Sequence, residues 1–236
     1  MNLFVVGIVF LAVLTQTVTG FGLALVSMAL LSQWLGIQVA APLVAMVAAL
    51  LEITLLVLRR DAVNWRVVWR LSLASVVGIP LGILAVKIVD GQIVLTILGI
   101  VIAAYAAYAL ASPRLPSLVW PGWAYGAGFL AGLLSGAYNT GGPPVVMYGD
   151  SQRWSPAEFK TNLQGFFFLN DALVIGGHAL SGHLTPAVWG HWASALPSVA
   201  LGLLVGLSVE RYINPLILRK IVLLLLVVVG VRLILQ

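Results

Sequence analysis

The chain has 236 residues, of which 61% are hydrophobic and 8% are charged, and its mean hydropathy is +1.10. This composition excludes a soluble globular protein and indicates one that crosses a lipid bilayer several times, in the cell inner membrane or plasma membrane. The net charge of +5 is explained by basic loops beside anionic lipid rather than by nucleic-acid binding. The sequence has no cysteine, which excludes disulfides, thiol catalysis and Cys-ligated metals.

Most of the chain divides into apolar segments of the length that a transmembrane helix needs, which is about 20 residues. In chain order, we expect such helices at residues 39–58, 71–89, 93–111, 159–180, 188–209 and 215–235. Two further apolar segments, 3–35 and 120–148, are too long for one crossing and too short for two full helices. Each is interrupted near its middle, the first by TGFG and the second by GAYNTGGPP.

The two interruptions occupy related positions. A shift of 120 residues superposes Gly22 on Gly142 and Trp34 on Trp154. We therefore predict two repeats of about 118 residues, a weak internal repeat of the kind found in many secondary transporters. The expected parts of this single integral membrane domain are a first repeat at 1–112, a linker at 113–122 and a second repeat at 123–236.

The basic residues discriminate between two topologies. If every segment crossed the bilayer fully, Lys and Arg would divide equally between the two faces and would give no orientation. If the interrupted segments are re-entrant hairpins, only Lys87 and Arg232 lie apart from the other basic residues. The positive-inside rule favours the second arrangement, with both termini outside the cytoplasm. The expected fold is therefore all-α, with two inverted repeats that each contain a broken re-entrant helical hairpin and three transmembrane helices.

The interruptions are expected to be functional, because backbone without helical hydrogen bonds is tolerated at membrane depth only inside protein or beside a wet cavity. New helices should begin near Gly22 and Pro144, and a helix N-terminus offers free N–H donors and about half a positive charge. Two such ends, brought together by an inverted repeat, would bind a small anion. The residues expected to bind it are Thr17, Thr19, Gly20, Phe21, Gly22, Asn139, Thr140, Gly141, Gly142 and Pro143. The alternative is a glycine-mediated helix crossing or kink.

Polar side chains also interrupt the apolar segment 159–180. Asn162 and Gln164 are further candidates for substrate binding. A carboxylate inside a membrane is costly and is a functional hypothesis by default, so a coupling proton could reside on either of two buried acids. The candidates for coupling or gating are Asp171, Glu52, Asn170, Lys160 and Arg153. The alternatives for these residues are interhelical hydrogen bonds and ordinary interfacial anchors.

Two stretches resemble a known family. GFGLALVSMALL at 20–31 and GLLSGAYNTGGPPVVMYGDSQRWSPAEFKTNLQGFFFLND at 132–171 are similar to the signature regions of the sulfite exporter TauE/SafE family, also called the 4-toluene sulfonate uptake permease group. The first stretch departs from a GxGGG-like pattern at Phe21 and Leu23. The resemblance implies a secondary transporter or exporter of small sulfur-containing anions, such as sulfite or organosulfonates.

The leading interpretation is an anion transporter that works by alternating access and is coupled to protons through a carboxylate. The alternatives are a passive anion channel and a structural membrane subunit. An enzyme is not expected, because the chain lacks HExxH and GxSxG, and Met147 stands where a GxGD motif needs glycine. No cofactor or metal is expected, since the three histidines lack metal-ligand spacing with Asp or Glu.

Overall fold

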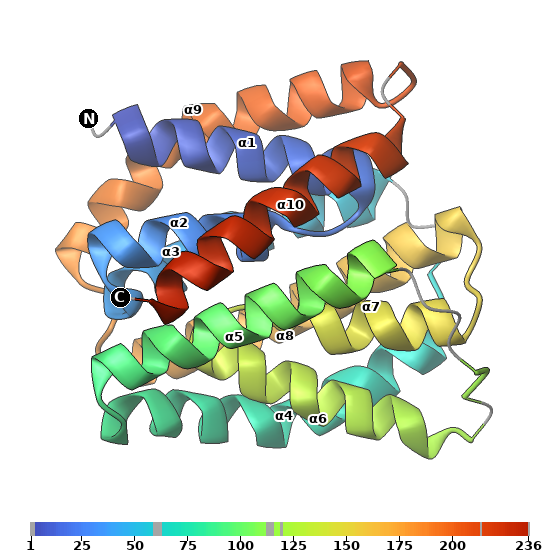
Figure 1. Ribbon diagram of the computed structural model, residues 1–236, viewed down its shortest axis with the longest axis horizontal. Coiled ribbons are helices and arrows are strands. Elements are labelled where there is room, and N and C mark those ends of the chain that lie inside the picture. Colours follow the sequence, from blue (N-terminus) through green and yellow to red (C-terminus); the bar gives the residue numbers. More distant parts are fainter. Residues whose placement is uncertain (1–2, 59–62, 112–115, 119, 213, 236) are drawn as a thin grey trace.

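The computed structural model describes residues 3–58, 63–111, 116–118, 120–212 and 214–235. Within these ranges the secondary structure consists of ten helices (Figure 1). They are α1 (Leu3–Thr19), α2 (Leu23–Leu35), α3 (Ile37–Leu58), α4 (Trp65–Ile88), α5 (Gly91–Ala111), α6 (Gly122–Tyr138), α7 (Gly142–Ser151), α8 (Pro156–Leu180), α9 (Pro186–Val209) and α10 (Pro215–Ile234). Arg59, Arg60, Arg114 and part of the predicted linker at 113–122 lie outside the described residues.

The expectation of an all-helical membrane protein is confirmed. Four helices, α3, α4, α5 and α9, are long and apolar enough to cross a membrane, while α1 and α2 are shorter apolar helices. Helices also lie at the expected positions of the remaining spans, but α8 contains several polar side chains and α10 contains three basic residues. The chain is therefore a multi-pass membrane protein whose most polar helices come from its second half.

Side-chain caps fix where several helices begin. Ser155 accepts a hydrogen bond from the Glu158 N–H, and the Glu158 side chain accepts one from the Ser155 N–H, which together form a capping box for α8. Thr185 and Asn214 cap α9 and α10 in a simpler way, and a proline follows each of the three caps. Proline suits the first turn of a helix, where no N–H partner is needed. Each of these helices therefore has a start that the sequence defines.

Glycines allow three helix pairs to approach closely. A Cβ atom on Gly132 of α6 would lie 2.6 Å from the Cα atom of Ser75 on α4. Gly206 of α9 faces Thr17 of α1 in the same way, and Gly230 of α10 faces α5. Small residues at such crossings are the usual means by which membrane helices pack backbone to backbone. The pairs α4–α6, α1–α9 and α5–α10 are accordingly the most extensive helix contacts of the described chain.

These contacts join helices of the first half, α1–α5, to helices of the second half, α6–α10. The first helix of each half packs on the fourth helix of the other, as α1 on α9 and α6 on α4. The third helices, α3 and α8, contact each other, as do the fifth helices, α5 and α10. Figure 1 shows both chain ends at the left edge with the α4–α5 connection, whereas the α7–α8 and α9–α10 connections lie at the right edge. The two interrupted segments meet inside this arrangement.

Candidate functional site

Both interrupted segments break where glycine and proline cluster. The first break, residues 20–22, separates α1 from α2, and it contains Gly20 at φ +90° and Gly22 at φ +111°. These left-handed conformations favour glycine because it has no Cβ atom. The second break, residues 139–141, separates α6 from α7, and Asn139 ends α6 with a φ of 51°. Gly142, Pro143 and Pro144 then form the first turn of α7.

One buried cavity is lined by both breaks. The first break contributes Phe21 and Gly22, and the first turn of α2 contributes Ala24 and Leu25. The second break contributes Asn139, Thr140 and Gly141, and α7 contributes Gly142. About 20 Å³ of the cavity is open to the centres of water-sized spheres, which exceeds the roughly 10–15 Å³ that one water needs. The first turns of α2 and α7 therefore face the same enclosed space.

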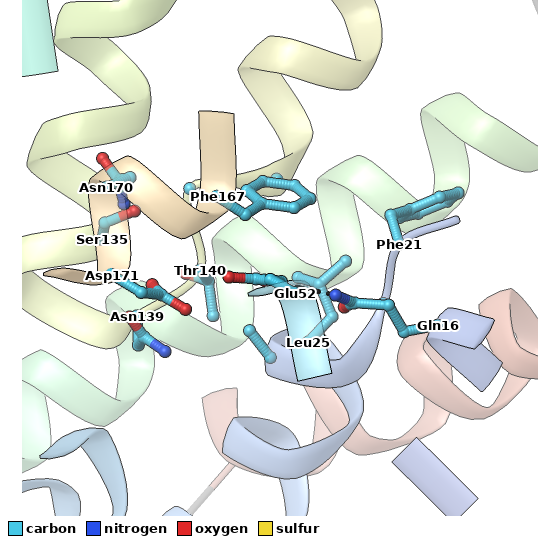
Figure 2. Close-up of a pocket in the computed structure, with 14 residues that line it drawn as sticks. Gln16, Phe21, Leu25, Glu52, Ser135, Asn139, Thr140, Phe167, Asn170 and Asp171 are labelled. Atoms are coloured by element: carbon cyan, nitrogen blue, oxygen red, sulfur yellow. Dashed lines mark hydrogen bonds between the residues drawn. The ribbon is translucent and has the colours of Figure 1, made fainter. Parts of the chain in front are cut away.

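Two carboxyl groups meet at this cavity. Glu52 from α3 and Asp171 from α8 are only 2% and 5% exposed, and both line the cavity (Figure 2). Their side chains interact with each other at short range. Two ionised carboxylates repel at such a distance. A proton on one member of the pair would remove this repulsion and allow a hydrogen bond between them.

Gln16 of α1 connects the carboxyl pair to the first break. Its Nε2 donates to Glu52 Oε1 at 3.2 Å, and its Oε1 accepts from the Leu23 N–H at 3.1 Å. Nε2 also lies 3.4 Å from Gln164 Oε1, and Gln164 in turn donates to the Gly20 carbonyl at 2.9 Å. Two amide side chains thus satisfy backbone groups that the break leaves unpaired.

Asn139 connects the pair to the second break. With its amide oriented to match its neighbours, Asn139 donates to Asp171 Oδ1 at 3.1 Å and accepts from the Ala45 N–H at 3.1 Å. A continuous set of polar contacts therefore runs from Leu23 through Gln16, Glu52 and Asp171 to Asn139. A change in the protonation of the carboxyl pair would alter the polar contacts that Gln16 and Asn139 make at the two breaks.

Several polar atoms of the cavity residues have no partner among the described residues. They are Glu52 Oε2, Thr140 Oγ1 and Asn170 Oδ1, each buried from solvent. Leaving a buried polar group unpaired costs about 1–3 kcal/mol. Because native proteins pair nearly all such groups, three of them around one cavity indicate a place for a polar ligand or for water.

The structure brings together about half of the residues expected at the site. Phe21, Gly22, Asn139, Thr140, Gly141, Gly142, Asn170, Asp171 and Glu52 line the cavity. Gly20 and Gln164 lie behind it, where the Gly20 carbonyl accepts from Gln164. Pro143 is buried in the first turn of α7.

The other expected residues make contacts elsewhere. Thr17 donates to the Val13 carbonyl of its own helix at 2.8 Å, and Thr19 donates to the Thr15 and Phe21 carbonyls. Asn162 accepts from the Asn64 N–H at 2.7 Å and so joins α8 to the start of α4. Lys160 donates to the Val18 carbonyl and forms an ion pair with Glu210. Arg153 is exposed between α7 and α8 with a φ of 53°.

Five cavity residues were missed by the sequence interpretation, among them the apolar Ala24 and Leu25 of α2. Gln16, Ser135 and Phe167 all line the cavity, and Gln16 is central to its hydrogen bonds. A signal for Gln16 existed, because an amide within the apolar run of α1 is as conspicuous as the polar residues of α8. Ser135 and Phe167 are unremarkable among small and aromatic membrane residues, and nothing in the sequence distinguishes them.

A multi-pass membrane protein with a buried polar cavity between two broken helices has the features of a secondary transporter. A family model for the sulfite exporter TauE/SafE family matches residues 5–233. The chain belongs to this family of membrane transporters, which are not enzymes.

Two curated relatives agree with this assignment. A probable sulfite/organosulfonate exporter TauE from Cupriavidus necator is 28% identical over 232 residues, covering 93% of this chain and 88% of the relative. A probable inner membrane transporter protein TsaS from Comamonas testosteroni is 25% identical over 173 residues, covering 72% of each chain. No solved structure gave a significant match.

Proposed function

We propose that the protein is a secondary transporter that exports small sulfur-containing anions, such as sulfite or organosulfonates, across the cell inner membrane. The anion would bind in the cavity between the two breaks and reach each side of the membrane by alternating access. The single observation that carries this proposal is that the first turns of α2 and α7 line one buried cavity. The named relatives supply the substrate class and the inner-membrane location.

The chemistry of the cavity suits an anion of a few heavy atoms. Each helix N-terminus contributes about half a positive charge and several N–H groups without intrahelical partners. Pro143 and Pro144 have no N–H, so the donors of the second break would come from Gly141 and Gly142 and from the Thr140 hydroxyl. The enclosed space is small, which favours compact oxyanions over bulky ones.

The inverted repeat belongs to the same proposal. Exchanged packing of α1 on α9 and of α6 on α4 supports a pseudo-two-fold relation between 1–112 and 123–236. Both chain ends lie at one edge of the molecule (Figure 1), which supports two re-entrant hairpins, α1–α2 and α6–α7, that enter from opposite sides. With the other basic residues facing the cytoplasm, Lys87 and Arg232 would lie on the outer face.

In this proposal, anion transport is coupled to the protonation of Glu52 and Asp171. An anion and two ionised carboxylates would repel one another in the same enclosed space. A protonated Glu52–Asp171 pair removes this repulsion, and its O–H groups can donate to the anion. Anion binding would therefore be tightest when the pair is protonated, so that anion transport would be coupled to proton binding and release.

The test is anion binding to the purified protein by calorimetry, with sulfite, sulfate, thiosulfate, methanesulfonate, chloride and acetate. Saturable binding of a sulfur oxyanion is expected, and it should weaken in Asn139→Gly, which removes the amide yet keeps the left-handed backbone accessible. Folded protein that binds none of these anions would contradict the proposal. Flux in proteoliposomes that follows membrane potential but ignores a pH gradient would indicate a passive channel instead.

A further inference from the structure

A second, smaller cavity adjoins the central one and is here called the outer cavity. Thr15, Thr19 and Arg219 line it, together with Phe21, Gly22 and Leu25. The last three residues also line the central cavity, so the first break and the first turn of α2 form the wall between the two spaces. Figure 2 shows the Phe21 ring at the opposite end of the central cavity from Asp171 and Asn139.

Arg219 near the start of α10 is placed to hold an acceptor at this wall. Its guanidinium lies 5.3 Å from the centre of the Phe21 ring. Its Nε is buried and has no hydrogen-bond partner among the described residues. A guanidinium presents a rigid fork of N–H donors that matches the oxygens of an oxyanion. The guanidinium also interacts with the buried Tyr105 side chain. Its unused Nε donor indicates a further binding role in addition to these two contacts.

One acidic side chain balances the charge of Arg219. The Asp150 carboxylate at the end of α7 attracts the Arg219 guanidinium electrostatically. Helix α7 therefore connects the second break to the outer cavity, because it starts at the central cavity and ends near Arg219. Asp150 would compete with any anion for the same cation.

We infer that Arg219 forms a capture site for compact oxyanions in the outer cavity, and that Phe21 is the partition between this site and the central cavity. The inference rests on the proposed function, since it adds a second anion site to the same route. Only about 10 Å³ of the outer cavity is open to the centres of water-sized spheres, the lower limit for one water. The passage is closed in this conformation, so the Phe21 ring must move off Arg219 before an anion can pass.

The test compares charge-neutralising variants of two neighbouring residues, Arg219→Gln and Lys220→Gln, in proteoliposomes loaded with radiolabelled sulfite. Lys220 is exposed on the same helix and is the matched control. Arg219→Gln should lower the initial flux about tenfold and flatten its dependence on ionic strength, whereas Lys220→Gln should transport like the unsubstituted protein. Asp150→Asn should raise the initial flux, because it removes the carboxylate that competes with the anion for Arg219.

Two further measurements keep the outcome clear. Arg219→Lys retains the charge and should recover part of the flux, and the melting temperature of each variant reports whether it folds. Equal flux from Arg219→Gln and Lys220→Gln would overturn the capture site, even with sulfite binding to the central cavity intact by calorimetry. Absence of saturable sulfite binding to the unsubstituted protein would overturn the proposed function and this inference with it.

Discussion

Glu52 and Asp171 meet at one buried cavity, although one is on α3 and the other on α8. Helix α3 is the third helix of the first half and α8 the third of the second half, and the two pack against each other. The carboxyl groups are not equivalent in register, because the 120-residue shift places Asp171 on Leu51 rather than on Glu52. The two acids therefore do not occupy matching positions in the sequence, and Gln16 lies beside one of them and Asn139 beside the other.

Glu52→Gln should make transport insensitive to a pH gradient. The amide keeps the size of the side chain and its ability to bond Gln16 and Asp171, but it cannot release a proton. The measurement is methanesulfonate flux in proteoliposomes at several pH values, because this sulfonate keeps its charge throughout the range. Asp90→Asn is the matched control, since Asp90 is exposed between α4 and α5. Unchanged pH dependence in Glu52→Gln would remove this acid from the coupling step.

Thr140→Val should weaken anion binding without lowering the stability of the protein. The Thr140 hydroxyl is buried and has no partner among the described residues, so replacing it with a methyl group should leave the melting temperature unchanged or raise it. Loss of a hydroxyl that contacts the anion should weaken binding by about 1.4 kcal/mol, or roughly tenfold.

The control for Thr140→Val is Thr54→Val, whose hydroxyl donates to the Leu50 carbonyl of its own helix away from the cavity. Calorimetry and thermal unfolding of both variants provide the comparison. A Thr140→Val protein with full sulfite affinity would place the anion away from the second break.

The positions of the helix breaks could be predicted from the sequence, whereas the side-chain contacts between them could not. Gly20, Gly22 and the Pro143–Pro144 pair determine local backbone geometry, and local geometry is readable from residue type. The Glu52–Asp171 contact depends on how α3 and α8 are rotated about their axes. The sequence alignment of the two halves does not reveal this rotation, because it places Asp171 one residue away from Glu52. Thr17 and Asn162 were misleading for a related reason, since a polar side chain in a membrane helix can satisfy itself locally or at a helix junction.

Gly132→Ala should destabilise the protein, because the new methyl group would meet the Ser75 backbone of α4 at 2.6–2.7 Å. Overpacking of this kind costs about 1–3 kcal/mol. Gly126→Ala on the same helix has no heavy atom within 4 Å of its added Cβ, and it should be neutral or slightly stabilising through helix propensity. Thermal unfolding in detergent compares the two. Equal melting temperatures would mean that α4 and α6 can move apart without any loss of stability.

Stability should fall as the pH is lowered through the titration range of His183, which lies between α8 and α9. Partial burial, with a smaller contribution from the Lys87 charge, lowers the pKa of His183 below its usual value of 6.5. The unfolded chain therefore binds a proton at a higher pH than the folded chain, so unfolding is favoured by acid. This contribution to stability is complete above the unfolded pKa and is lost as the pH falls toward the folded one. Melting temperatures between about pH 8 and pH 5 should decline less steeply in His183→Gln, which cannot take up the proton. His191→Gln is the control on a neighbouring helix, and the same slope in both variants would exclude His183 as the source of the acid sensitivity.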